Sequence, residues 1–116
     1  MSAEDRLIVT PTRPPAHSYF VGRRESDAAE IYELTATGGE RLRPGRRHRQ
    51  RGLDWRGSEE ARMELSHLLI SRVSNQRPSR DLQARFSLHV LGRLPVSGFV
   101  LESDDLARWL RVAGFD

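Results

Sequence analysis

The sequence predicts an α+β domain in which a small antiparallel sheet, begun by an N-terminal hairpin, packs on about three helices. Two early segments, "YFVGRR" and "AEIYEL", are rich in the aromatic and β-branched residues that are typical of strands. Three later segments repeat apolar residues at the three-and-four spacing of helices with one buried side. A chain of 116 residues suits one such domain.

The two early segments are expected to pair as a hairpin, with the polar stretch "ESDA" as the loop between them. The second strand has no clean apolar face, because Ile31 and Glu33 share one side of it and Tyr32 and Leu34 share the other. A Gly-Gly pair at 38–39 then predicts a turn, and a third short strand is expected at residues 41–43.

The first helix is expected to begin after Ser58, an N-cap residue followed by Glu59 and Glu60 at the positive end of the helix dipole. It should end at residues 75–78, where a proline follows polar residues. Its predicted buried stripe is Ala61, Leu65, Leu68, Leu69 and Val73.

The second helix is expected at about 79–93 and should be the central helix, because much of its circumference is apolar. Its apolar residues are Leu82, Phe86, Leu88, Val90 and Leu91. His89 lies among Leu82, Phe86 and Val90 on the helical wheel, so it is expected to be a core or boundary residue rather than a catalytic base.

The C-terminal part predicts a turn between Pro95 and Gly98, a short strand in "FVLES" and a last helix capped by Ser103. Gly114 is the expected stop of this helix. The predicted buried stripe is Leu106, Trp109, Leu110 and Ala113.

Residues 1–18 are expected to form an extended or partly disordered arm, because prolines recur there, and residues 19–116 are expected to form a single domain. Within the arm, residues 7–10 could add an edge strand. No apolar run approaches the roughly 20 residues of a membrane span, and the acidic start with its short apolar stretch does not fit a secretory signal. The sequence therefore predicts a cytoplasmic protein, and the lack of cysteine excludes disulfides and thiolate metal sites.

Positive charge is concentrated in one segment of the chain. All 19 basic residues are arginine, and six of them fall within residues 41–51, which contain no acidic residue. The rest of the chain has 13 arginines and 16 acidic residues, so it is slightly acidic although the whole chain carries a formal charge of +3. The positive field is therefore local, even if the absence of lysine itself reflects a GC-rich coding sequence.

The positions that carry a family resemblance are spread over most of the chain: Phe20, Gly22, Arg23, His48, Gly52, Leu53, Trp55, Gly57, Ser58, Ala61, Met63, Phe86, Val90, Leu94, Pro95, Phe99, Leu101, Asp105 and Leu106. In these positions, most closely from Gly52 to Leu110, the chain resembles a family of small bacterial, plasmid and phage proteins known only as a domain of unknown function. The family pattern begins Tyr-x-Gly-Arg, passes through Gly-Phe-x-Trp-Gly-Tyr-x-Gly-Ser-Gly-Pro-x-Gln-Leu, and ends Phe-x-x-x-Val-x-x-x-Leu-Pro-x-x-x-Trp-x-Leu with a final helix.

The chain departs from this pattern at "WRGSEEAR", which is two residues shorter than the corresponding family stretch and lacks its Gly-Pro and glutamine. Any role of those residues in the family therefore does not carry over. The resemblance implies the fold and a bacterial or mobile-element origin. It implies no mechanism.

No combination of residues predicts catalysis, a metal or a cofactor. The histidines at 17, 48, 67 and 89 are scattered, and the single Glu64-x-x-His67 pair is better explained as a solvated helix face than as a metal site. The adjacent acids at 59–60 and 104–105 are placed to serve helix starts. The sequence lacks a phosphate loop and a Gly-x-Ser-x-Gly nucleophile motif. A non-enzymatic protein is expected.

The predicted binding residues are the six clustered arginines, Arg41, Arg43, Arg46, Arg47, Arg49 and Arg51. Each could neutralise a phosphate of nucleic acid or of a nucleoprotein complex, and Pro44-Gly45 indicates a loop rather than a recognition helix. Trp55 could stack on a base or could instead be a core anchor. Arginine pairs equally well with carboxylates, so the alternatives are an adaptor or inhibitor that docks on an acidic protein surface, and a merely solvated loop.

Overall fold

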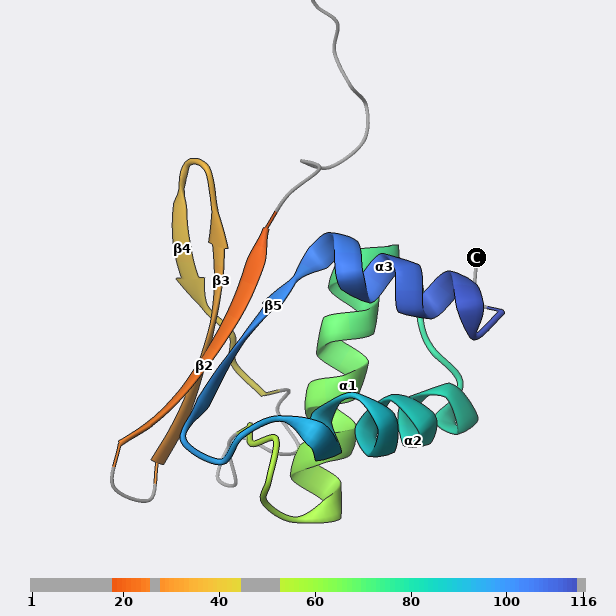
Figure 1. Ribbon diagram of the computed structural model, residues 1–116, viewed down its shortest axis with the longest axis horizontal. Helices are drawn as coiled ribbons and strands as arrows, with labels where there is room; N and C mark the ends of the chain where they lie inside the picture. Colours follow the sequence, from red (N-terminus) through yellow and green to blue (C-terminus); the bar gives the residue numbers. More distant parts are fainter. Residues whose placement is uncertain (1–17, 26–27, 45–52, 115–116) are drawn as a thin grey trace, which may run out of the picture.

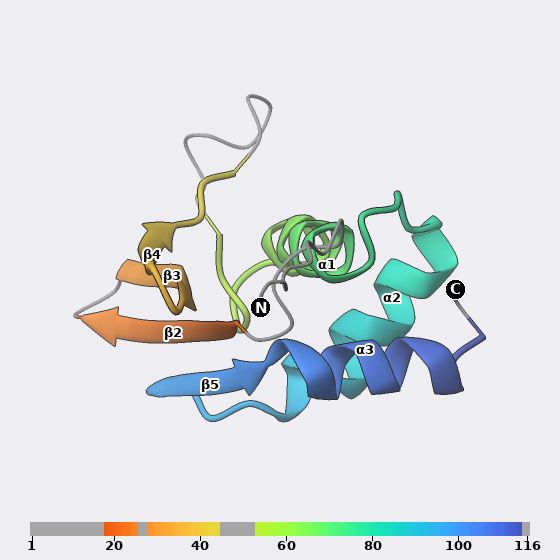
Figure 2. The ribbon, with the colours of Figure 1, turned by 90° about the horizontal axis from the view of Figure 1, so that it is seen from above.

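The computed structural model describes residues 18–25, 28–44 and 53–114 of the chain. Four strands form one antiparallel sheet, and three helices lie to one side of it (Figures 1 and 2). The α+β prediction is confirmed. Of the expected arm at 1–18, all but the last residue lies outside the described residues, including the possible edge strand at 7–10.

The sheet has the strand order β4-β3-β2-β5. Strands β2 (Tyr19–Glu25) and β3 (Ala28–Thr35) form the predicted hairpin, in which Val21 pairs with Tyr32. Strand β5 (Gly98–Glu102) adds to the free side of β2 and leads directly into α3 (Ser103–Val112), as Figure 1 shows. The C-terminal strand therefore completes the sheet that the N-terminal hairpin begins.

Strand β4 (Gly38–Arg41) begins three residues earlier than predicted. The turn lies at residues 36–37, and the glycine pair belongs to the strand, where Gly39 faces Leu34 across the ladder. The Thr35 hydroxyl holds this turn, since it donates to the Gly38 carbonyl at 3.1 Å and accepts from the Thr37 backbone N–H at 3.3 Å. Gly38 has φ +150°, which only glycine adopts without strain.

The uneven face of β3 has a structural reason. Ile31 and Glu33 both point toward the helices: Ile31 enters the core, and Glu33 pairs with Arg72 of α1 (Glu59–Ser74). The same guanidinium reaches Glu40 of β4 at 3.1 Å. One arginine on the helix thus neutralises two carboxylates on the helix-facing side of the sheet.

Helix α1, rather than the second helix, is the central one. It lies nearer the sheet than α2 (Arg80–His89) does in both views (Figures 1 and 2), and its Leu65 and Leu69 are fully buried. Helix α2 ends earlier than predicted, and a short 3-10 turn, η2 (Leu91–Arg93), places Leu91 in the core. Leu88 is 66% exposed. The prediction that the second helix is the central one was therefore wrong.

One of the two predicted N-caps, Ser58, is confirmed, and Ser79 is a further cap that was not predicted. The hydroxyls of Ser58 and Ser79 each accept a backbone N–H at 3.1 Å, from Ala61 and Leu82 respectively. Ser103 is not a cap, because it is the first residue of α3 and its hydroxyl accepts the backbone N–H of Ser18 at 3.0 Å.

The core lies between the sheet and the helices. Its buried members are Phe20, Ile31, Leu42, Leu53, Trp55, Leu65, Leu69, Ile70, Leu82, Phe86, Leu91, Phe99, Leu106 and Leu110. Gly22 makes room for one of them, since a Cβ at this position would lie 2.1 Å from the ring of Phe99. Leu42 is the second residue of the arginine-rich stretch and Leu53 lies two residues after it, and both are buried in the core.

Candidate functional site

The structure describes two of the six predicted binding arginines. Arg41 is the last residue of β4, and Arg43 follows it after the buried Leu42. Arg46, Arg47, Arg49 and Arg51 lie outside the described residues. Arg41 and Arg43 are both exposed, so the beginning of the arginine-rich stretch presents its charge to solvent.

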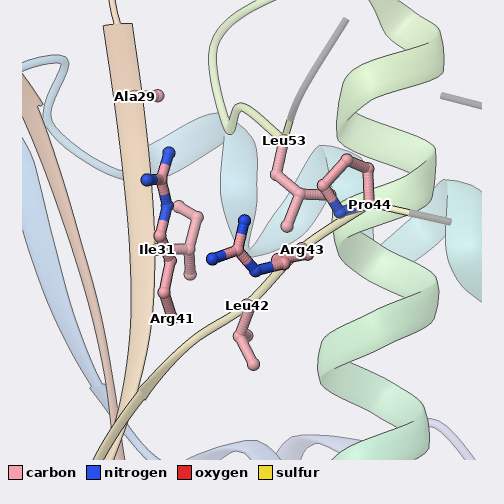
Figure 3. Close-up of a pocket in the computed structure, with 7 residues that line it drawn as sticks. All are labelled: Ala29, Ile31, Arg41, Leu42, Arg43, Pro44 and Leu53. Carbon is pink, nitrogen blue, oxygen red and sulfur yellow. The ribbon is translucent and has the colours of Figure 1, made fainter. Parts of the chain in front are cut away.

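These two arginines line a pocket of about 450 Å³. Its full lining is Ala29, Ile31, Arg41, Leu42, Arg43, Pro44 and Leu53. Figure 3 shows both guanidinium groups in the space between β3 on one side and Leu53 with Pro44 on the other. Two cations therefore stand beside a mainly aliphatic wall.

The pocket lies where β3 extends past the end of β4. The β3–β4 pairing stops with Tyr32 opposite Arg41, and the Leu42 backbone N–H then donates to the Ile31 carbonyl at 2.8 Å. Beyond this bond the chain leaves the sheet toward Pro44. Within the described residues, the first residues of β3 have a strand partner only on the β2 side.

Glu30, the acidic side chain that Arg41 contacts, is already engaged. Glu30 accepts a hydrogen bond from Arg23 Nε at 3.1 Å and one from the Tyr32 hydroxyl at 3.2 Å. The Arg23 hydrogen bond is the main reason why the pKa of Glu30 lies below its ordinary value. Arg41 Nη1 is 3.8 Å from the other Glu30 oxygen, a loose contact. Arg43 makes no ion pair within the described part of the chain.

Trp55 is a core anchor and takes no part in the exposed surface. Its side chain is fully buried, its indole Nε1 donates to the Pro95 carbonyl at 2.8 Å, and its ring meets Phe99 edge to face at 4.9 Å. The Arg24 guanidinium lies 4.7 Å from the ring centre. A base has no access to this ring, so the stacking role considered from the sequence is excluded.

Arg24 also holds Asp54, the neighbour of Trp55, in a two-bond ion pair. Nη2 lies 2.6 Å from Oδ1 and Nη1 lies 3.2 Å from Oδ2. Partial burial raises the pKa of Asp54, but the bonds from Arg24 and from the Arg56 backbone N–H outweigh it and leave the pKa below its ordinary value. Sequence reasoning missed this pair, because 30 residues separate its members.

In the described residues, no three His, Asp or Glu side chains gather as they would to hold a metal ion. His67 Nδ1 is 3.0 Å from the Gln83 amide nitrogen, so it links α1 to α2. His89 is exposed, which corrects its predicted place in the core or at its boundary. None of the described helices is long and apolar enough to cross a membrane.

Comparisons with known proteins leave the assignment to the structure. No protein-family model, no curated protein and no solved structure matches the chain. Two features of the described residues stand out, the exposed Arg41 and Arg43 and the pocket that they line. The protein therefore belongs to the class of small α+β domains, and it has an arginine-lined pocket at the edge of its sheet.

Proposed function

We propose that this chain is a non-enzymatic, cytoplasmic binding domain that contacts nucleic acid, alone or in a nucleoprotein complex, through its arginine-rich stretch. Each of the six arginines would meet a phosphate and release condensed counterions. The observation that carries the proposal is the exposure of Arg41 and Arg43 on one pocket, with Arg43 lacking an acidic partner in the described residues. The contact requires no cofactor.

The surroundings of the stretch support this function. Leu42 and Leu53 are each less than a tenth exposed, and Asp54 is tied to Arg24, so the chain is anchored on both sides of Arg46, Arg47, Arg49 and Arg51. Anchored ends reduce the conformational entropy that four intervening arginines lose when they bind. Arginines elsewhere, such as Arg24 and Arg72, are used in internal ion pairs. Arg43, by contrast, makes no ion pair in the described residues and is available to meet a phosphate.

The test is a comparison of two variants that lose the same charge. The first changes Arg46, Arg47, Arg49 and Arg51 to alanine. The matched control changes four exposed arginines that make no ion pair within the described residues, Arg77, Arg85, Arg93 and Arg111. Affinity for a random-sequence, fluorescently labelled oligonucleotide is measured at low salt. We expect the first variant to lose about 100-fold and the control less than about fivefold, because only contacting arginines release counterions.

Equal losses in the two variants would show a nonspecific effect of net charge, and a wild-type protein that does not bind at low salt would refute the proposal. The alternative function, docking on an acidic protein surface as an adaptor or inhibitor, is supported by the aliphatic wall beside the arginines. It predicts tighter binding to polyglutamate than to nucleic acid. The same four-alanine variant should then lose the polyglutamate affinity.

We also propose that the chain is a divergent member of the family of unknown function that it resembles, with a bacterial or mobile-element origin. Many of the matching positions are core positions here, among them Phe20, Trp55, Phe86, Phe99 and Leu106. Core positions constrain the fold more than the function, so this relationship would leave the binding proposal unchanged. It is tested by a structure of a family member, which should have the same strand order.

A further inference from the structure

The pocket beside Arg41 and Arg43 joins charged and apolar surfaces in one concave site. We infer that it takes one unpaired nucleotide, so that the protein binds single-stranded nucleic acid in preference to a duplex. This inference rests on the proposed function and narrows it to one class of nucleic acid. The pocket volume of about 450 Å³ falls in the range of roughly 300 to 1,000 Å³ that is typical of small-ligand sites.

The charged side of the pocket suits a phosphate. Arg43 has no carboxylate partner in the described chain, and Arg41, 47% exposed in its side chain, has only the loose 3.8 Å contact with Glu30. Figure 3 shows that the two guanidinium groups extend into the same space, although they come from opposite sides of Leu42 in the sequence. Planar guanidinium groups bind phosphate oxygens in pairs and also stack on bases.

The apolar side of the pocket suits the face of a base. Ile31, Leu42 and Leu53 are core residues, less than a tenth exposed, so their positions are set by packing behind them. Ala29 and Pro44 complete the wall with small or rigid side chains that lose little conformational freedom when a ligand binds. The apolar surface open to a flat ring is therefore mainly that of Ala29 and Pro44, over core residues that packing holds in place.

The concave shape of the pocket is the reason why we expect single-stranded nucleic acid to bind more tightly than a duplex. In a duplex the bases are stacked and paired, and a protein that does not enter a groove meets chiefly phosphates and sugars. A base of a single strand can leave its stack and lie in a pocket, with arginine or an apolar side chain against its face. Only the single strand can thus use the aliphatic wall and the two arginines together.

The test fills the pocket without changing its charge. Ala29→Leu adds three carbons on the pocket side of β3, and Ala28→Leu, at the neighbouring residue that points to the opposite face of the strand, is the matched control. Dissociation constants are measured for single-stranded and duplex oligonucleotides of equal length, after thermal melts show that both variants are folded. We expect wild type to prefer the single strand about tenfold, and Ala29→Leu alone to lose most of that preference.

A second variant serves if Ala29→Leu does not fold. Arg43→Gln removes an exposed charge on the pocket, and Arg77→Gln removes one elsewhere. We expect the first to weaken single-strand binding about fivefold more than duplex binding, and the second to weaken both equally and slightly. Nucleic-acid binding with equal affinity for the two forms, or a preference unchanged by Ala29→Leu and Arg43→Gln, would overturn the inference and leave the proposed function standing. A lack of any nucleic-acid binding would overturn both.

Discussion

Arg24 and Asp54 form a two-bond ion pair that ties strand β2 to the segment following the arginine-rich stretch, with Nη2–Oδ1 at 2.6 Å and Nη1–Oδ2 at 3.2 Å. Arg24 Nε donates at 3.1 Å to the carbonyl of Val96, in the turn before β5. The same guanidinium lies over the ring of Trp55. One side chain therefore joins three segments that are distant in the sequence.

The first prediction concerns the energy of this pair. Asp54→Ala and Arg24→Ala should each lower the free energy of unfolding by about 2 kcal/mol, because each leaves a half-buried charged partner without its hydrogen bonds. The double variant should cost about 1 kcal/mol less than the sum of the two. Urea unfolding of the four proteins measures this coupling. Strict additivity would show that the pair contributes nothing.

The second prediction concerns pH. The pKa of Asp54 is lower in the folded protein than in the unfolded chain, where it is about 3.9. Its contribution to stability is therefore complete above that value and is lost as the pH falls through the folded pKa. The stability difference between wild type and Asp54→Asn should stay constant from about pH 7 to pH 5 and shrink below about pH 4.

Asp105→Asn is the control for this pH series, since Asp105 is largely exposed in its ion pair with Arg108. Its stability difference from wild type should stay small across the same range. A difference for Asp54→Asn that persists undiminished at pH 2 would contradict the assigned direction of the pKa shift.

The third prediction concerns close packing between β2 and β5. Gly22→Ala should destabilise the protein by about 2 to 3 kcal/mol, because the added Cβ would lie 2.1 Å from an atom of the Phe99 ring. At Gly39 the corresponding Cβ would meet the end of the Leu34 side chain, which is 41% exposed and can move aside. Gly39→Ala should therefore cost much less. Thermal unfolding of the two variants decides the comparison, and similar losses would contradict it.

The fourth prediction separates Trp55 from the binding surface. Trp109→Phe leaves Trp55 as the only tryptophan. Because Trp55 is fully buried, its fluorescence should resist quenching by acrylamide and should not change when nucleic acid is added. Strong quenching by nucleic acid would place Trp55 in the interface and would contradict its role as a core anchor.

Local signals in the sequence predicted most elements of the fold. The Ser58 cap needs only a hydroxyl placed three residues before a backbone N–H, and the hairpin needs two β-rich segments and a polar loop. Such features depend on neighbours in the chain, so they can be predicted without the tertiary structure. Of the two roles that the sequence left open for Trp55, the structure shows the core anchor, and Arg41 is exposed.

Features that depend on distant contacts were not predicted. The exposure of Leu88 and His89 follows from the way in which α2 packs on α1, and a helical wheel cannot show this. Ser103 was predicted to be a cap because it precedes two acidic residues. Its actual partner, Ser18, is 85 residues away in the sequence and could not be predicted from neighbours. The pocket was missed for the same reason, since Ala29 and Leu53 become neighbours only through the fold. The arginine cluster, in contrast, could be identified directly from the sequence, because six arginines lie within residues 41–51.

The salt dependence of binding tests the central claim most directly. For a single-stranded oligonucleotide, six phosphate contacts predict a slope of log affinity against log salt concentration of about −4, and the variant with Arg46, Arg47, Arg49 and Arg51 changed to alanine should have a slope of about −1.4. The control variant at Arg77, Arg85, Arg93 and Arg111 should keep the wild-type slope. A wild-type slope near zero, or the same slope in both variants, would contradict phosphate binding by this stretch.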